Sequence, residues 1–248
     1  MAAFFILSGY TYSGEKYTWM DYCWKKIVTL LIPMFTVNTL FIGFYALTVK
    51  LNLYSYVETG TYAGFFIGLK RLFSLGLSCT EMGGATWFLI ALFFAETLFK
   101  TIQKCVNDNV KYDIPVAVLI GVGGYCLSSK GIYFPFSFDL GLYASFFFAV
   151  GVFLKRNRVL EKFNDFFMSC ASIVMIYILV KYYFRDQLPM NWPTRQFDNI
   201  IIQFISVFCS FYVCYCASQY IIRLKKISNF LFYCLYNGVK TLAFRRIL

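Results

Sequence analysis

Histidine is absent from the 248-residue sequence, and charged residues are scarce. Only 14% of the residues are charged, whereas soluble domains average about 25%, so the charged side chains are too few to cover a water-facing surface. With 60% hydrophobic residues, the composition instead indicates an integral membrane protein. The lack of histidine removes the side chain that titrates near neutral pH without perturbation.

Nine cysteines are present, but none of them forms a CxxC pair and most lie in apolar stretches. This pattern favours small buried side chains over a disulfide framework or a zinc site, so no metal is predicted. No basic segment or cleavage site follows Met1, so the sequence does not predict a secretory signal either.

Long apolar stretches predict the fold class, which is an all-α polytopic bundle of about seven to eight membrane segments forming a single domain over residues 1–248. A helix needs about 20 apolar residues to cross a bilayer. A polar turn is predicted over residues 11–26. The predicted membrane segments are residues 1–10 (a partial span), 27–49, 85–99, 114–129, 139–154, 166–180, 199–222 and a last piece near 227–235.

The distribution of positive charge predicts how these segments are oriented. Of the 23 Lys and Arg residues, 16 fall in one set of alternate loops and seven in the other. Cytoplasmic loops carry the excess of Lys and Arg, so the larger set is assigned to the cytoplasm. The net charge of +11 therefore reflects orientation, and nucleic acid is not an expected partner. The larger set occupies residues 16–26, 100–111, 155–162 and 223–246.

The apolar stretch at residues 62–77 is interrupted by Lys70 and Arg71. A complete span here would move the later members of the larger basic set to the outside. The stretch is therefore predicted to be re-entrant or interfacial.

Small residues recur at a spacing of four in two places, which predicts helices that approach one another closely. The "GVGG" at 121–124 lies inside a predicted span, which argues against a phosphate-binding loop. The two stripes are Gly60, Gly64 and Gly68, and Gly141, Ser145 and Ala149.

Three short motifs follow one another along the first hundred residues. "FFILSGY" (residues 4–10) is predicted to end at the cytoplasmic face, where the Ser8 hydroxyl can bond back to its own helix. Gly9 leaves a bare stretch of backbone that another helix or a ligand can approach. The other two motifs are "WKKIVTLLIPMF", with a basic pair and an early proline, and "GGATWFLIALFF".

In this order the motifs resemble the integral membrane acyltransferase 3 family, especially the fucose 4-O-acetylase kind that acetylates bacterial cell-surface sugars. The resemblance is strongest over residues 4–100 and looser to about 230. It implies a multi-pass protein of the bacterial cytoplasmic membrane that moves an acetyl group to a hydroxyl of a carbohydrate or lipid-linked glycan. The implied partners are the bilayer, the glycan and acetyl-CoA, which is a donor substrate and not a bound cofactor. The residues that match the family motifs are Phe4, Phe5, Trp87, Phe88 and Leu89.

Lys25, Lys26, Ser8 and Gly9 are predicted to bind the donor, because coenzyme A is cytoplasmic and carries phosphates that lysine can hold. The alternative for the two lysines is an orientation anchor that reaches lipid headgroups. Trp87 is predicted either to anchor the chain at the outer interface or to serve the sugar site.

Charged residues elsewhere have less specific predictions. On the acceptor side we expect Glu81 and Arg71 to face the glycan, although each also fits a solvated or headgroup-facing charge. Glu96 and Lys100 are four residues apart and predict a local ion pair.

A catalytic base is missing from this picture. The family supplies an arginine and a histidine from a helix that precedes the "FFILSGY" helix, and neither that helix nor any histidine occurs here. We therefore expect a chain that lacks the family's first helix and its C-terminal helices and is inactive as written, with its catalytic residues unknown. The alternatives are a transporter or flippase subunit, disfavoured by the scarcity of mid-span charges, and a scaffolding fragment without a ligand.

Overall fold

The computed structural model describes eleven stretches of the chain, and within them the protein is helical apart from one short strand pair. The strands, β1 (Met190–Asn191) and β2 (Gln196–Phe197), are antiparallel. The predicted all-α class is thus confirmed, while the count of seven to eight membrane segments remains a prediction. The described residues are 2–51, 65–75, 87–106, 109, 111–131, 134–162, 166–179, 181, 190–191, 196–197 and 201–219.

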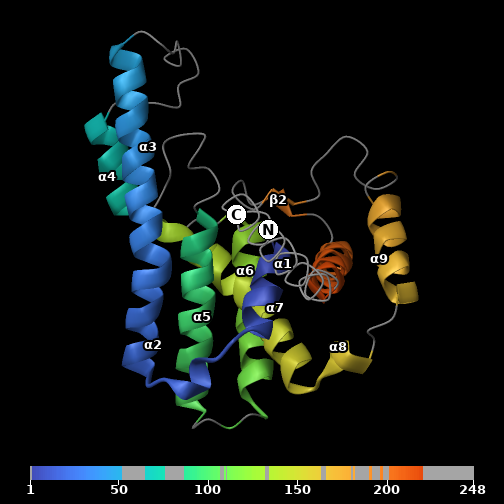
Figure 1. Ribbon diagram of the computed structural model, residues 1–248. Coiled ribbons are helices and arrows are strands. Elements are labelled where there is room, and N and C mark those ends of the chain that lie inside the picture. Colours follow the sequence, from blue (N-terminus) through green and yellow to red (C-terminus); the bar gives the residue numbers. More distant parts are fainter. Residues whose placement is uncertain are drawn as a thin grey trace, which may run out of the picture. The chain divides into compact units, whose positions relative to one another are not determined.

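The helices follow the predicted apolar stretches closely (Figure 1). Among the described residues, three helical stretches are long and apolar enough to cross a membrane, namely Trp19–Thr48, Pro135–Arg156 and Ile201–Gln219. In chain order, the helical elements that the structure names are α1 (Ala2–Tyr10), η1 (Gly14–Lys16), α2 (Trp19–Lys26), η2 (Ile27–Leu31), α3 (Ile32–Lys50), α4 (Phe65–Leu75), α5 (Trp87–Cys105), α6 (Asp113–Ser129), η4 (Pro135–Ser137), α7 (Phe138–Arg156), α8 (Val159–Lys162) and α9 (Phe166–Ile178).

Two compact units make up the chain. One comprises Met1–Lys162 with Asp186–Gln203, and the other comprises Phe163–Arg185 with Phe204–Leu248. In the second unit, Ile173, Val174, Met175, Tyr177 and Ile178 of α9 are exposed, whereas Phe211 is buried. All of the features described below lie in the first unit.

The predicted polar turn over residues 11–26 is wrong in its second half, because α2 already begins at Trp19. Thr18 caps this helix, and its hydroxyl oxygen accepts a hydrogen bond from the backbone N–H of Asp21. Such a cap satisfies a backbone donor that would otherwise have no partner in the first turn. Lys25 and Lys26 therefore lie on a helix, which fixes their direction.

A π-helical turn, η2, joins α2 to α3 in one long column (Figure 1). Pro33 lies two residues after its end and has no backbone N–H with which to continue the α-helical ladder. Such a turn locally changes the helical register and is frequent at functional sites. Here the widened turn begins at Ile27, directly after the basic pair.

Helix α7 lies at the centre of the first unit, where small residues let its neighbours come close. A methyl group on Gly9 of α1 would lie 2.1 Å from the Phe148 carbonyl oxygen of α7, and one on Gly151 of α7 would lie 2.1 Å from the Ile6 carbonyl oxygen of α1. On another side of α7, the Ser145 hydroxyl donates to the Ala117 carbonyl oxygen of α6 across 3.2 Å. Close packing is thus confirmed for the stripe on α7, where a methyl group on Gly141 would also lie 2.6 Å from Phe94 of α5, whereas Gly60 and Gly64 of the other stripe lie outside the described residues.

Two of the three glycines of "GVGG" belong to the same packing. Gly121 and Gly124 of α6 face the backbone of α7, where added methyl groups would lie 2.7 Å or less from α7 atoms. The structure thus places both of them in a helix contact inside α6.

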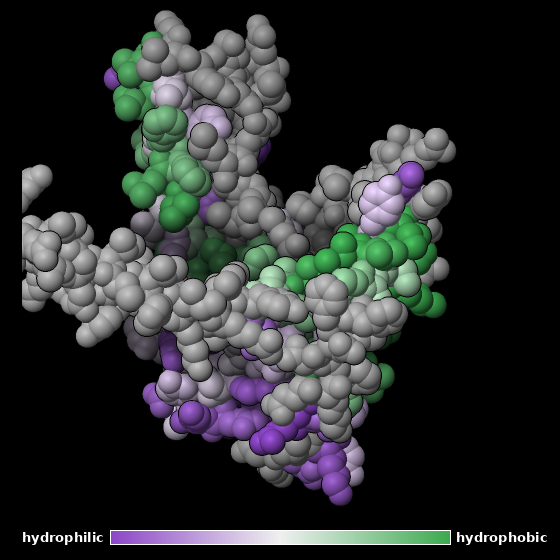
Figure 2. Space-filling model, turned by 45° about the vertical axis from the view of Figure 1, so that its right-hand side comes forward, coloured by the Kyte–Doolittle hydropathy of each residue, from purple (hydrophilic) through white to green (hydrophobic). Residues whose placement is uncertain are grey.

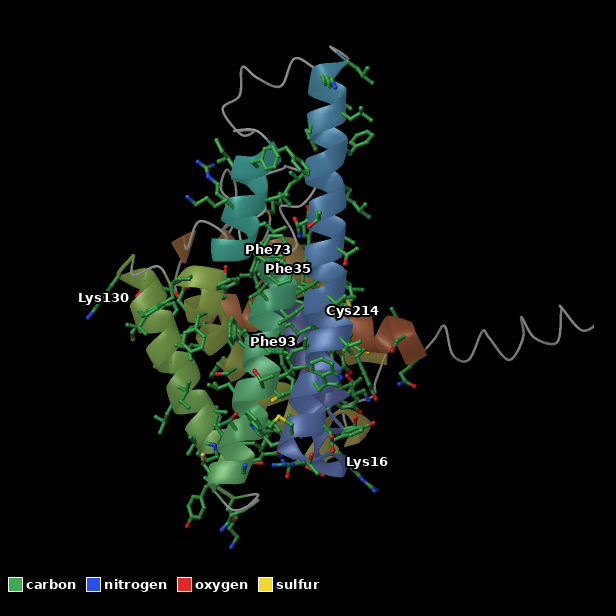
Figure 3. The ribbon with its side chains drawn as sticks, turned by 90° about the vertical axis from the view of Figure 1, so that its left-hand side faces the viewer. Lys16, Phe35, Phe73, Phe93, Lys130 and Cys214 are labelled. Carbon is green, nitrogen blue, oxygen red and sulfur yellow. The ribbon has the colours of Figure 1, made fainter. Side chains whose placement is uncertain are left out.

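Helix α4 is too short to cross a bilayer, since 11 residues rise only about 16 Å against a hydrocarbon core of about 30 Å. It lies beside α3, where the rings of Phe35 and Phe73 stack at 5.3 Å (Figure 3). Its length agrees with the predicted re-entrant or interfacial segment, although residues 62–64 and 76–77 lie outside the described part. A shared apolar cluster joins α3, α4 and α5 through Met34, Ile42, Leu72 and Ile90.

Three of the four loops assigned to the cytoplasm meet at one end of the first unit, and the fourth, at residues 223–246, lies outside the described part. The α1–α2 connection, the end of α5 and the α7–α8 turn lie there together (Figure 1), and hydrophilic residues gather at this end (Figure 2). Lys16 lies at this end and Lys130 at the opposite one (Figure 3). In the described part of the first unit, the more basic and the less basic loops therefore alternate between two ends in space as they do along the sequence. We call this the basic end.

Candidate functional site

A small pocket of about 60 Å³ lies at the basic end, where α1, the connection that follows it, α2 and α5 meet. Its walls combine hydroxyl groups with two ammonium groups and one carboxylate. Three of the four predicted donor-binding residues line it, namely Lys25, Lys26 and Ser8. The lining residues are Ser8, Thr11, Tyr12, Ser13, Tyr17, Tyr22, Lys25, Lys26 and Glu96.

Glu96 joins three helices at the floor of this pocket. Glu96 is only 2% exposed, and its carboxylate accepts a hydrogen bond from the Ser8 hydroxyl of α1 at 2.5 Å. The Tyr22 hydroxyl of α2 donates to it across 3.1 Å, and the Lys26 ammonium lies 2.5 Å away. A buried carboxylate needs such partners, because an isolated charge is costly away from water.

The predicted local pair between Glu96 and Lys100 is wrong. Lys100 lies one turn further along the same helix, but among the described residues the ion pair of Glu96 is with Lys26 from α2. The approach of two helices places the α2 ammonium directly on the carboxylate, a geometry that spacing along one helix does not reveal.

Lys25 lies at the exposed rim of the pocket. Its ammonium donates to the Tyr17 hydroxyl at 2.8 Å and sits 4.4 Å from the centre of that ring. The hydrogen bond and positive charge from Lys25 lower the pKa of the Tyr17 hydroxyl below its usual value. No carboxylate in the described part of the chain pairs with Lys25, so its charge is not neutralised as that of Lys26 is.

Tyr12 connects the pocket to a second polar network. Its ring packs edge-to-face on Tyr22, and its hydroxyl donates to the Gln103 side-chain oxygen at 2.7 Å. Burial, followed by the nearby charges of Glu15 and Glu96, raises the pKa of Tyr12, so the hydroxyl stays protonated and remains a donor.

The second network holds the basic end together. The Gln103 side chain donates to Asp113 at 3.4 Å, and Arg156 contacts both oxygens of Asp113 at 2.9 and 2.7 Å. Arg156 also pairs with Glu15 at 3.0 Å. Elements far apart in sequence are thus bound around the pocket by charge-assisted hydrogen bonds.

Ser8 and Gly9 take different roles although they are neighbours. The Ser8 hydroxyl was expected to bond back to its own helix, but it donates to Glu96 instead, and Thr11 makes the bond back to the Leu7 carbonyl oxygen. Gly9 is not among the pocket-lining residues. The bare backbone at Gly9 was predicted to face another helix or a ligand, and in the structure it faces a helix, α7.

The residues of the two family motifs meet in the fold. The Phe88 ring lies 4.8 Å from the Phe5 ring and 5.9 Å from the Phe4 ring. Trp87 is buried, at 8% exposure, and packs edge-to-face on Phe88, while Leu89 joins the apolar cluster between α3, α4 and α5. The motif residues therefore form a packing contact between the starts of α1 and α5.

The acceptor-side residues are not brought to this pocket. Arg71 is exposed on α4, and Glu81 lies outside the described residues. The sequence reasoning also missed the pocket roles of Tyr12, Tyr22 and Glu96. Only Glu96 carried a usable signal, since it is an acidic residue inside an apolar stretch.

The arrangement suits the binding of an anionic or strongly polar group. It offers one ammonium group that no carboxylate neutralises, several hydroxyl donors and a buried carboxylate. Within the described part of the chain, no three Cys, Asp or Glu residues group as metal ligands do.

Comparison with known proteins identifies one match. A family model described as an acyltransferase domain matches residues 1–235, nearly the whole chain. No curated protein and no solved structure matches the chain.

Proposed function

The chain belongs to this acyltransferase family, and we propose that it is of the membrane-bound O-acetyltransferase type, whose reaction acetylates a cell-surface glycan of bacteria. In the proposed reaction a glycan hydroxyl oxygen attacks the thioester carbonyl of acetyl-CoA. The bond from that carbon to sulfur breaks, an O-acetyl ester forms, and the hydroxyl proton ends on the released thiolate, which leaves as the free thiol of coenzyme A. The donor is acetyl-CoA and the acceptor is a carbohydrate or lipid-linked glycan.

The observation that carries the proposal is the position of the pocket at the basic end. Coenzyme A is confined to the cytoplasm and carries several phosphate charges, and the excess of Lys and Arg is typical of cytoplasmic loops. Lys25 supplies an unneutralised positive charge there, and Lys26, which is paired with Glu96, and Ser8 supply hydrogen-bonding groups beside it. Gly9, the residue after Ser8, lets α1 pack closely against α7, and this packing helps to hold Ser8 at the site.

The acceptor is proposed to approach from the opposite end. Arg71 is exposed on the short helix α4, which lies along α3 (Figure 1). Together with Glu81 it belongs to the segments assigned to the outside by the charge distribution. A guanidinium group there suits an anionic group of a lipid-linked sugar.

The base that receives the hydroxyl proton is not assigned. General base catalysis works best with a group whose pKa lies near the working pH, and the 248 residues contain no histidine. We therefore propose that a polypeptide of these 248 residues binds acetyl-CoA without completing the transfer.

Binding of radiolabelled acetyl-CoA to the detergent-purified chain tests the proposal. We expect saturable binding that falls at least about tenfold when Lys25 and Lys26 are both changed to Gln, because each charge-assisted contact contributes about 1.5–3 kcal/mol. The matched control is Lys104→Gln with Lys111→Gln, which removes two charges from the same end but none from the pocket. Equal losses in both double variants, or no binding by the unchanged chain, would refute the donor site.

A further inference from the structure

Glu96 divides the pocket into two regions of different charge. The Lys26 ammonium is 2.5 Å from a Glu96 oxygen, and the side chains are 22% and 2% exposed, so this pair is withdrawn from water and close to neutral. Lys25, by contrast, is exposed and contacts only the neutral Tyr17 hydroxyl among the described residues. The rim therefore carries the unneutralised positive charge, and the floor carries almost none.

The floor nevertheless has many hydrogen-bonding groups. The Ser8 and Tyr22 hydroxyls both donate to Glu96, which leaves their oxygens available as acceptors. The Lys26 ammonium has three hydrogens, one of which points at the carboxylate. An uncharged group with both a donor and an acceptor, such as an amide, matches this floor.

A phosphate on the floor would meet a different environment. It would lie beside the Glu96 carboxylate, and it would compete with that carboxylate for Lys26. Taking Lys26 away would leave Glu96 buried without its counter-charge, which is strongly unfavourable. The volume of about 60 Å³ also admits one small group, whereas sites for whole drug-sized ligands span about 300–1,000 Å³.

We propose, resting on the donor assigned above, that Glu96 is a positioning and specificity-determining residue. By neutralising Lys26 and orienting Ser8 and Tyr22, it reserves the floor for an amide of the pantetheine arm of coenzyme A. The phosphates then bind at the rim, on Lys25. The two lysines, adjacent in sequence, thus act on different parts of the donor.

Competition by two fragments of the donor tests whether the floor binds the amide and the rim binds the phosphates. Pantetheine carries the amides without phosphate, and adenosine 3′,5′-bisphosphate carries phosphates without the amide arm. Each displaces labelled acetyl-CoA from the purified chain, and its inhibition constant is measured for every variant. We expect Lys25→Gln to weaken the bisphosphate about tenfold and to leave pantetheine unchanged, as loss of one charge-assisted contact predicts.

Variants of the floor should behave in the opposite way. Ser8→Ala and Tyr22→Phe each remove one hydroxyl and should weaken pantetheine by about two- to tenfold without affecting the bisphosphate. Glu96→Gln keeps the shape but frees the Lys26 charge. It should therefore shift the ratio of the two inhibition constants about tenfold towards the bisphosphate.

The matched control is Glu15→Gln. Glu15 is also a carboxylate paired with a cation at the basic end, but it does not line the pocket, so this variant should leave the ratio unchanged. Equal weakening of both fragments by Glu96→Gln would show a merely structural role and overturn the inference. So would Lys26→Gln weakening the bisphosphate as much as Lys25→Gln does.

The experiment distinguishes a failure of the proposed function from a failure of the division between rim and floor. If the unchanged chain binds no acetyl-CoA, the donor assignment itself is wrong. If it binds acetyl-CoA but the fragments do not separate between rim and floor, only the role given to Glu96 is wrong. Because the serine and tyrosine variants alter single hydroxyl groups, the division can be judged even if Glu96→Gln does not fold.

Discussion

Single residues in this protein act mainly through what another helix places against them. Glu96 shows this for charge. Its hydrogen-bond donors, Ser8 of α1 and Tyr22 of α2, lie 88 and 74 positions away in the sequence. Gly9 shows it for volume, because the atom nearest to its missing side chain belongs to the backbone of α7. Neither partner can be inferred from neighbours in the sequence.

Gly9→Ala should destabilise the protein by about 1–3 kcal/mol, because the new methyl group would lie 2.1 Å from the Phe148 carbonyl oxygen and the backbones would have to separate. Thermal unfolding of the detergent-purified chain, followed by tryptophan fluorescence, measures the effect. Gly123→Ala is the matched control. That position has no atom within 4 Å of the added methyl group, so alanine there should be neutral or slightly stabilising. Equal losses at both sites would contradict the packing argument.

At the scale of elements, the column formed by α2, η2 and α3 decides where the basic pair points. The column begins at the Thr18 cap and changes its hydrogen-bond register just before Pro33. A turn over residues 11–26 would have left Lys25 and Lys26 free to follow lipid headgroups. On the helix, they occupy successive positions about 100° apart, and one meets Tyr17 while the other meets Glu96.

Thr18→Ala tests how strongly the cap supports this column. Loss of the side-chain acceptor for the Asp21 N–H should cost about 1 kcal/mol and weaken acetyl-CoA binding, because the first turn carries the basic pair. Thr18→Ser keeps the acceptor and should behave like the unchanged chain. Thermal unfolding and donor binding, measured on the same samples, report the two effects. An unaltered Thr18→Ala protein would mean that tertiary contacts alone hold α2.

Across the described part of the first unit, loops that alternate in sequence also alternate between two ends in space. At the basic end, Arg156 pairs with Asp113 and Glu15. Lys130 lies at the far end (Figure 3). The membrane orientation assigned to these ends remains a prediction of the charge distribution.

Amine labelling of intact cells tests that orientation. A membrane-impermeant reagent should modify Lys130 in intact cells, and Lys16 and Lys25 only after the cells are permeabilised, with modified peptides identified by mass spectrometry. All three side chains are exposed, so accessibility to water is matched. Modification of Lys25 from outside would place the pocket away from coenzyme A and contradict the donor assignment.

The sequence by itself determined the helical class, the approximate bounds of α3, α5, α6, α7 and α9, and the alternation of charge, because apolar length and loop charge are local properties of the chain. It also indicated Ser8, Lys25 and Lys26 as neighbours of one site. Only the tertiary structure decided that Glu96 pairs with Lys26, that Tyr12 and Tyr22 line the pocket, and that the aromatic motifs meet. These contacts join helices that are far apart in the sequence, so they depend on how the helices are arranged in space and not on local properties of the chain.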